Sequence, residues 1–106
     1  MTKDWLSMTA STLGRGIEVG DIDPVELMEM YFETAKSHPF SDKIFARFTE
    51  GRALNESKSS RVRARKGTRK SLLDGVPISW KDLFDTAGVV TEAGSLLLEK
   101  RTPEID

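Results

Sequence analysis

The sequence predicts an α/β fold, with three or four helices arranged around a few strands. The run from Val76 to Trp80 is β-branched and aromatic, which is the composition of a buried strand. The dipeptide Asp23-Pro24 is a sharp helix start, because aspartate caps a helix and proline suits its first position. The chain has 106 residues, of which 38% are hydrophobic and 31% charged, enough for one domain with a modest core.

The first predicted helix covers residues 7–19, with Ser7 or Thr9 as its N-terminal cap. Two glycines inside it, Gly14 and Gly16, each weaken a helix by about 1 kcal/mol relative to alanine. This helix therefore needs a partner surface to stay formed.

The second predicted helix begins at Pro24 and runs to about Ser37, before Pro39. One side is apolar, as expected of a surface that faces the core: Leu27, Met30, Tyr31 and Thr34. Three carboxylates lie on the other side: Glu26, Glu29 and Glu33. Paired carboxylates can carry out acid–base chemistry, but a solvated acidic face is the favoured interpretation.

The middle of the chain is predicted to hold a short strand at Ile44–Thr49 and a helix at residues 50–65. Small residues on that helix, among them Ser57 and Ser60, would allow close packing against another element. A basic cluster ends the helix: Arg61, Arg63, Arg65, Lys66, Arg69 and Lys70. No aromatic residue interleaves these cations and no phosphate loop is present, so a charged helix end and loop is favoured over a nucleic-acid surface.

The last quarter is predicted to contain a turn at residues 85–88, a short strand or extended piece at Val89–Thr91, and a helix capped by Ser95 and ending near Lys100. Composition sets further bounds. The chain has no cysteine, which excludes disulfides and thiolate metal sites. No apolar run reaches the ~20 residues of a membrane helix, and the N-terminus (residues 1–6) lacks the apolar core of a signal peptide, so a cytoplasmic protein without membrane contact is expected.

Lys81 stands at the end of the most apolar run of the chain. Strand alternation would place it on one face with Ser79 and Leu83, pointing inward or along a cleft. A buried lysine is costly unless it is paired or neutral, and a neutral amine is a general base. The alternatives are an ion pair with Asp82 or Asp85, or a side chain that extends to the surface.

Residues 73–82 follow the pattern L-x-G-V-P-x-x-x-K-D, in which the lysine is Lys81 and the final aspartate is Asp82. The pattern T-x-x-G-S follows at residues 91–95. In this order the two patterns resemble those of the amidase signature family, and residues 21–27 and 43–46 resemble segments that precede them. The resemblance implies a mixed β-sheet covered by helices, and hydrolysis or transfer of amide groups through a Ser–cis-Ser–Lys triad.

By this resemblance, Lys81 is the catalytic lysine, which takes a proton from a bridging serine that in turn deprotonates the nucleophilic serine. The family carries that nucleophile in a Gly/Ser-rich segment, and no such segment follows Lys81 here. Residues 1–106 are therefore expected to be the N-terminal portion of a single amidase domain, truncated before its nucleophile and inactive alone. The resemblance implies no cofactor and no metal, and a small-molecule amide as substrate of the complete enzyme.

Other functions stay open beside amide hydrolysis. The chain could be part of a glutamyl-tRNA amidotransferase A-type subunit, or an inactive remnant that serves as an interaction module. An incomplete fold would expose apolar surface, so a complementing C-terminal segment or a homo-oligomer is the expected partner. A dyad of Ser79 and Lys81 is disfavoured, because strand rise would separate them by ~6.5–7 Å and no oxyanion hole is visible.

Overall fold

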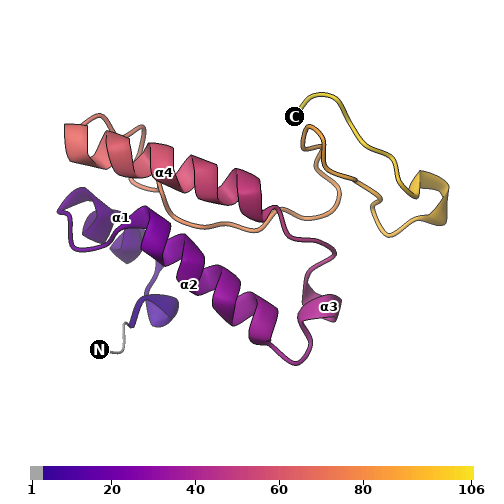
Figure 1. The fold of residues 1–106 in the computed structure, drawn as a ribbon, viewed down its shortest axis with the longest axis horizontal. Coiled ribbons are helices and arrows are strands. Elements are labelled where there is room, and N and C mark those ends of the chain that lie inside the picture. Colours follow the sequence, from indigo (N-terminus) through magenta and orange to yellow (C-terminus); the bar gives the residue numbers. More distant parts are fainter. Residues whose placement is uncertain (1–3) are drawn as a thin grey trace.

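The protein, described from a computed structural model over residues 4–106, is built from helices and irregular segments (Figure 1). The first three residues of the N-terminal stretch considered for a signal peptide lie outside this range. The elements in chain order are a 3-10 helix η1 (Asp4–Ser7), α1 (Ala10–Glu18), α2 (Pro24–Ser37), α3 (Ser41–Ile44), α4 (Glu50–Lys66) and a 3-10 helix η2 (Leu96–Leu98). None of these helices is long and apolar enough to span a membrane.

The predicted α/β fold, a mixed sheet covered by helices, is wrong for this structure. Residues 4–106 contain no strand, and their only β pairing is an isolated bridge between Thr86 and Val89. A strand needs the hydrogen-bonding edge of a second strand, and no described segment offers one to residues 76–80. Ile78 and Trp80 are 66% and 67% exposed instead of buried.

The strand predicted at residues 44–49 does not form, and of the two alternatives for residues 89–91 the strand does not form either. Ile44 ends the single-turn helix α3, and residues 45–49 are irregular. Thr91 lies in a loop, although its N–H donates to the carbonyl of Arg101 at 2.8 Å. The predicted C-terminal helix is shorter than expected: only η2 forms, and Ser95 caps it as predicted.

The predicted start of α2 is confirmed, and of the two caps considered for the first helix Thr9 is the one observed, so that α1 begins at Ala10 and not at residue 7. Thr9 accepts a hydrogen bond from the N–H of Thr12, and Asp23 accepts one from the N–H of Val25, with Pro24 at the first position of α2. These caps satisfy N–H groups that have no partner within the helix.

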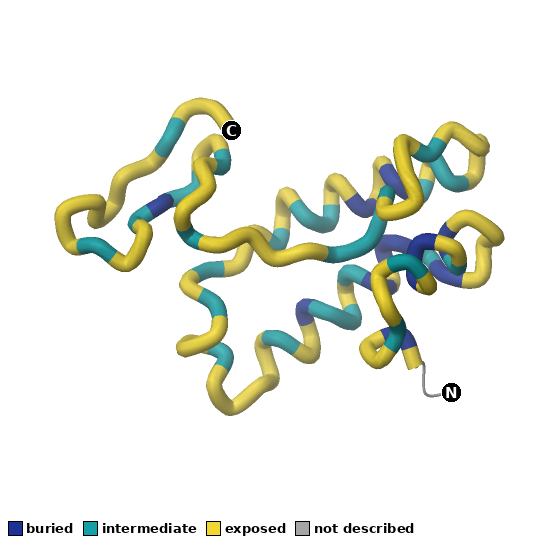
Figure 2. Tube along the Cα trace, turned by 180° about the vertical axis from the view of Figure 1, so that it is seen from behind, coloured by how far each residue is buried: buried dark blue, intermediate teal, exposed yellow. Residues whose placement is uncertain are grey.

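The core lies where η1, α1 and α2 meet (Figure 2), and consists of Trp5, Leu13, Ile17, Ile22 and Leu27. The predicted partner surface of α1 includes residues 72–76. A Cβ on Gly14 would lie 2.0 Å from the carbonyl oxygen of Leu72, so the backbone there approaches the helix as only glycine allows. Gly75 has φ +96° and lies against Pro24.

Helices α2 and α4 pack side by side (Figure 1). The buried residues of α4 are two small ones, Ser57 and Ser60, which agrees with the close packing predicted for that helix. The segment between α3 and α4 is attached to α2 by aromatic contacts. The Phe48 ring lies 5.9 Å from Phe32 of α2 and 5.1 Å from Phe45.

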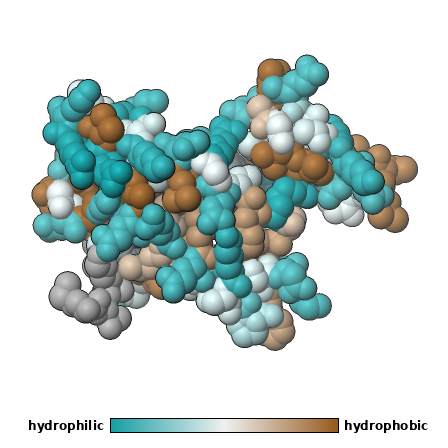
Figure 3. Space-filling view, in the orientation of Figure 1, coloured by the Kyte–Doolittle hydropathy of each residue, from teal (hydrophilic) through white to brown (hydrophobic). Residues whose placement is uncertain are grey.

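The C-terminal segment, residues 80–106, extends beyond the helices and has little core of its own. Thr91 is its only buried residue (Figure 2). Large apolar side chains stand exposed there, with Leu96 and Leu97 at 87% and 95%, and brown surface marks this end of the molecule in Figure 3. The segment is therefore held mainly by polar contacts.

Candidate functional site

Lys81 lies in a tight turn, which we call the lysine turn (residues 80–84). Its carbonyl oxygen accepts hydrogen bonds from the N–H groups of Leu83 at 2.7 Å and Phe84 at 3.2 Å. The rings of Trp80 and Phe84 meet edge to face at 5.5 Å across the turn. Lys81 itself is exposed, so the expectation that it points inward from a strand is wrong.

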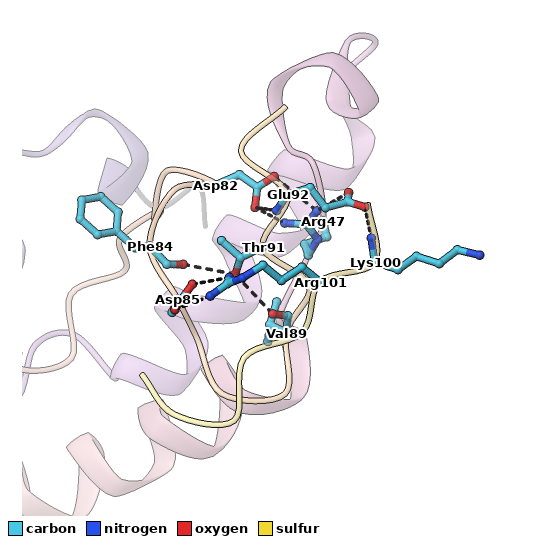
Figure 4. A network of polar contacts seen from close by, with 9 residues as sticks. All are labelled: Arg47, Asp82, Phe84, Asp85, Val89, Thr91, Glu92, Lys100 and Arg101. Atoms are coloured by element: carbon cyan, nitrogen blue, oxygen red, sulfur yellow. Dashed lines mark hydrogen bonds and ion pairs between the residues drawn. The ribbon is translucent and has the colours of Figure 1, made fainter. Parts of the chain in front are cut away.

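The residue after the lysine, Asp82, is held by an arginine from the segment before α4 (Figure 4). Arg47 donates from Nη1 to Asp82 Oδ1 at 2.7 Å and from Nη2 to Glu92 Oε1 at 3.2 Å. The three side chains are only 24–30% exposed. We call Arg47, Asp82 and Glu92 the Arg47 network.

The turn at residues 92–94 completes the binding of Asp82. The Glu92 N–H donates to Asp82 Oδ1 at 3.3 Å, and Ala93 and Gly94 have φ values of 50° and 67°. The Arg47 guanidinium, aided by the backbone N–H groups of Glu92 and Ala93, lowers the pKa of Asp82 despite its partial burial. The network thus brings the T-x-x-G-S pattern against the K-D pair.

The two acids that the sequence offers as partners for Lys81 are both paired with arginines. Asp82 binds Arg47, and Asp85 binds Arg101 through two hydrogen bonds of 2.7 and 3.0 Å. The Arg101 guanidinium also lowers the pKa of Asp85. Lys81 forms no ion pair with any residue between 4 and 106.

Asp74, whose carboxylate is buried, anchors the start of the motif at residues 73–82. Its side chain is 5% exposed and accepts from Arg63 Nε and Nη2, both at 2.7 Å, from Ser60 Oγ at 2.8 Å and from the N–H of Lys70 at 3.0 Å. The Arg63 guanidinium holds the pKa of Asp74 well below its usual range. Residues 73–82 are therefore fixed by an aspartate near each end; the irregular segment between them is half-buried at residues 75–77 and exposed at residues 78–81.

Three of the six cations in the basic cluster bind acids or carbonyl groups elsewhere in the fold. Arg61 pairs with Asp23 and Arg63 with Asp74, while Arg69 donates to the carbonyls of Leu72 and Asp74. These contacts favour the interpretation of the basic cluster as a charged helix end and loop over its interpretation as a nucleic-acid surface. The acidic side of α2 is exposed at all three glutamates, and no group of three or more metal-binding side chains occurs in the described part of the chain.

Ser79 is exposed, and the strand geometry on which a Ser79–Lys81 dyad was considered is absent. Sequence reasoning missed Arg47 as a site residue. The available signal was an arginine placed between two phenylalanines in a half-apolar run, where a cation needs a partner. Its partners, Asp82 and Glu92, are 35 and 45 positions away, so no local spacing indicates them.

Comparison with known proteins agrees with the two motif patterns. The profile of the family described as Amidase matches residues 12–106. The A subunit of glutamyl-tRNA(Gln) amidotransferase from Anaeromyxobacter dehalogenans is 38% identical over 93 residues, which are 88% of this chain and 19% of that protein. The mitochondrial A subunit of the same amidotransferase from Ornithorhynchus anatinus is 33% identical over 98 residues, 92% of this chain and 18% of that protein.

The corresponding A subunit from Myxococcus xanthus is 44% identical over 64 residues, 60% of this chain and 13% of that protein. No solved structure gives a significant match. The chain thus spans a fifth or less of the length of these relatives. Because the family profile covers nearly all of these 106 residues, the chain belongs to the amidase family.

Proposed function

We propose that this chain supplies Lys81 as the lysine of a Ser–cis-Ser–Lys triad in an amidase-type enzyme that hydrolyses or transfers amide groups. The two serines come from residues outside these 106, in a complementing part of the amidase domain. Family membership supports the reaction class. Lys81 forms no ion pair within residues 4–106, and this observation carries the assignment, because a proton acceptor must be free of competing acids.

In the complete site, the Lys81 amine accepts a proton from the bridging serine, which takes one from the nucleophilic serine. The nucleophile attacks the amide carbonyl, and an acyl-enzyme forms as ammonia or an amine leaves with the returned proton. Water or a second amine then attacks the acyl group. The described residues contribute the lysine and the turn that holds it.

An amidotransferase is the favoured form of this proposal over a simple hydrolase. The three relatives above are named as subunits of glutamyl-tRNA(Gln) amidotransferase. Transfer would use ammonia released from an amide donor to amidate the glutamyl group of a charged tRNA. Amidation of glutamyl-tRNA by a complemented sample supports this form, and ammonia release without any amidation supports the hydrolase.

The test is ammonia release from a panel of small amides. It compares the chain alone with the chain mixed with the remaining segment of a curated relative, which carries the serines. We expect no activity from the chain alone, activity on mixing, and loss of that activity with Lys81→Ala. Lys58→Ala is the matched control, since Lys58 is an exposed lysine on α4. Equal activity of the two variants would remove Lys81 from the mechanism.

A non-catalytic interaction module is the second candidate, favoured by the exposed apolar side chains of residues 78–98. Ile78, Trp80 and Phe84 are each more than half exposed, as are Leu96 and Leu97. Surfaces of this kind mark contact sites or promote aggregation. Formation of a stable complex with the complementing segment, in which neither wild type nor Lys81→Ala turns over any amide or amidates tRNA, would favour the module over the enzyme.

A further inference from the structure

We infer that Arg47 is a positioning residue, which keeps the Lys81 amine free by holding the neighbouring Asp82 carboxylate against the turn at residues 92–94. This inference rests on the proposed function of Lys81 as a proton acceptor. It assigns to Arg47 a role that the sequence patterns do not indicate.

Arg47 and Lys81 compete for the carboxylate of Asp82. A carboxylate adjacent in sequence to a flexible lysine can reach its ammonium group, and such a contact stabilises the protonated amine. Asp82 is withdrawn from that contact, because Arg47 Nη1 lies 2.7 Å from Oδ1 and Nη2 lies 3.5 Å from Oδ2. Arginine suits this task, since its planar guanidinium contacts both carboxylate oxygens and also reaches Glu92.

The arginine is itself held in place by aromatic packing. Its neighbours Phe45 and Phe48 pack ring to ring, and Phe48 also packs on Phe32 of α2. The backbone around Arg47 is thus attached to the helical body, while its guanidinium binds the C-terminal segment. Arg47 therefore links α2 to the lysine turn.

The other acids around the turn also have partners other than Lys81. Asp85 binds Arg101, and Glu92 binds Arg47 and the N–H of Lys100. The charged side chains paired around the turn are Arg47, Asp82, Asp85, Glu92 and Arg101, whereas Lys100 contributes only its backbone N–H (Figure 4). Loss of Arg47 releases Asp82, the acid next in sequence to Lys81.

The experiment measures the pH at which each lysine amine becomes reactive, using trace acetic anhydride between pH 8 and 11.5 and mass spectrometry of the peptides. In Arg47→Gln we expect the Lys81 midpoint to rise by about 0.3–0.7 pH unit, the effect of an exposed lysine–carboxylate pair. Lys58 in the same molecules is the internal control, and the pH midpoint of its labelling should be the same in both proteins. Arg47→Lys should restore part of the wild-type midpoint.

A double-variant cycle separates release of Asp82 from simple loss of a nearby charge. Asp82→Asn should lower the Lys81 midpoint more in the Arg47→Gln background than in wild type. Equal effects in both backgrounds, or an unchanged midpoint in Arg47→Gln, would overturn the inference. The labelling needs no turnover, so this failure is distinct from a failure of the proposed function, which the Lys81→Ala activity assay reports.

Discussion

Loss of the buried Asp74 carboxylate should destabilise this fold by a measurable amount. Asp74→Asn removes the charge from a side chain that is 5% exposed and accepts four hydrogen bonds, two of them from Arg63. The amide keeps one acceptor oxygen and turns an N–H₂ group toward the same donors. Hydrogen bonds to charged groups contribute about 1.5–3 kcal/mol each, so we expect a loss of about 2–4 kcal/mol in the free energy of unfolding.

The assay is urea unfolding of the 106-residue chain at pH 7, followed by far-UV circular dichroism of its helices. A domain of this size is stable by about 5–15 kcal/mol, so the expected loss is a large fraction of the total. Asp106→Asn is the matched control. It also breaks a carboxylate–arginine pair, with Arg52, but its side chain is 62% exposed and little change is expected. If Asp74→Asn and Asp106→Asn lost similar amounts of unfolding free energy, burial of the carboxylate would not explain the effect, and the reasoning would be refuted.

The pH dependence of Asp74 gives an independent check. Folding lowers the pKa of this carboxyl, mainly through Arg63, from the ~3.9 of an unfolded aspartate. Its contribution to stability is therefore complete above about pH 5 and decreases as the pH falls below about 4. The free energy of unfolding of wild type should exceed that of Asp74→Asn by a constant amount from pH 7 to pH 5. This excess should become smaller at lower pH. A constant difference down to pH 3 would contradict the assignment.

Three glycine substitutions test how closely residues 72–75 approach helices α1 and α2, with the open position Gly51 as the contrast. Gly14→Ala should destabilise the fold by about 1–3 kcal/mol although alanine favours helices, because its Cβ meets the Leu72 carbonyl. Gly51→Ala, at an open position of α4, should instead stabilise it by about 0.5–1 kcal/mol in the same urea assay. Gly75→Ala should cost about 1–3 kcal/mol, since φ is +96° and Pro24 lies 3.1 Å from the added carbon; unchanged stability would show that the loop moves freely.

The predicted parts of the fold that proved correct depend on local sequence. The start of α2 follows from Asp23 and Pro24, and its end at Ser37 agrees with the end predicted before Pro39. The helix predicted at residues 50–65 is observed as α4, Glu50–Lys66. Each of these signals acts within one helical turn. The motif patterns at residues 73–82 and 91–95 likewise indicate the amidase family from the order of residues alone, and the family profile confirms it.

The wrong predictions are those that needed a distant partner. Val76 to Trp80 has strand composition, yet it is irregular, because β-branched residues form a strand only beside another strand. Lys81 is exposed for the same reason, and its catalytic role stays a prediction. Propensity describes one segment at a time and cannot supply the second strand.

Local sequence therefore specifies the long helices, their caps and the family of this chain. Long-range packing determines which carboxylates Arg47, Arg63 and Arg101 bind, and through this the surroundings of Lys81. Arg47 meets Asp82 and Glu92 across 35 and 45 positions, and Arg63 meets Asp74 from another element. The physical reason is that charge pairing depends on distance in space, which the order of residues along the chain does not contain.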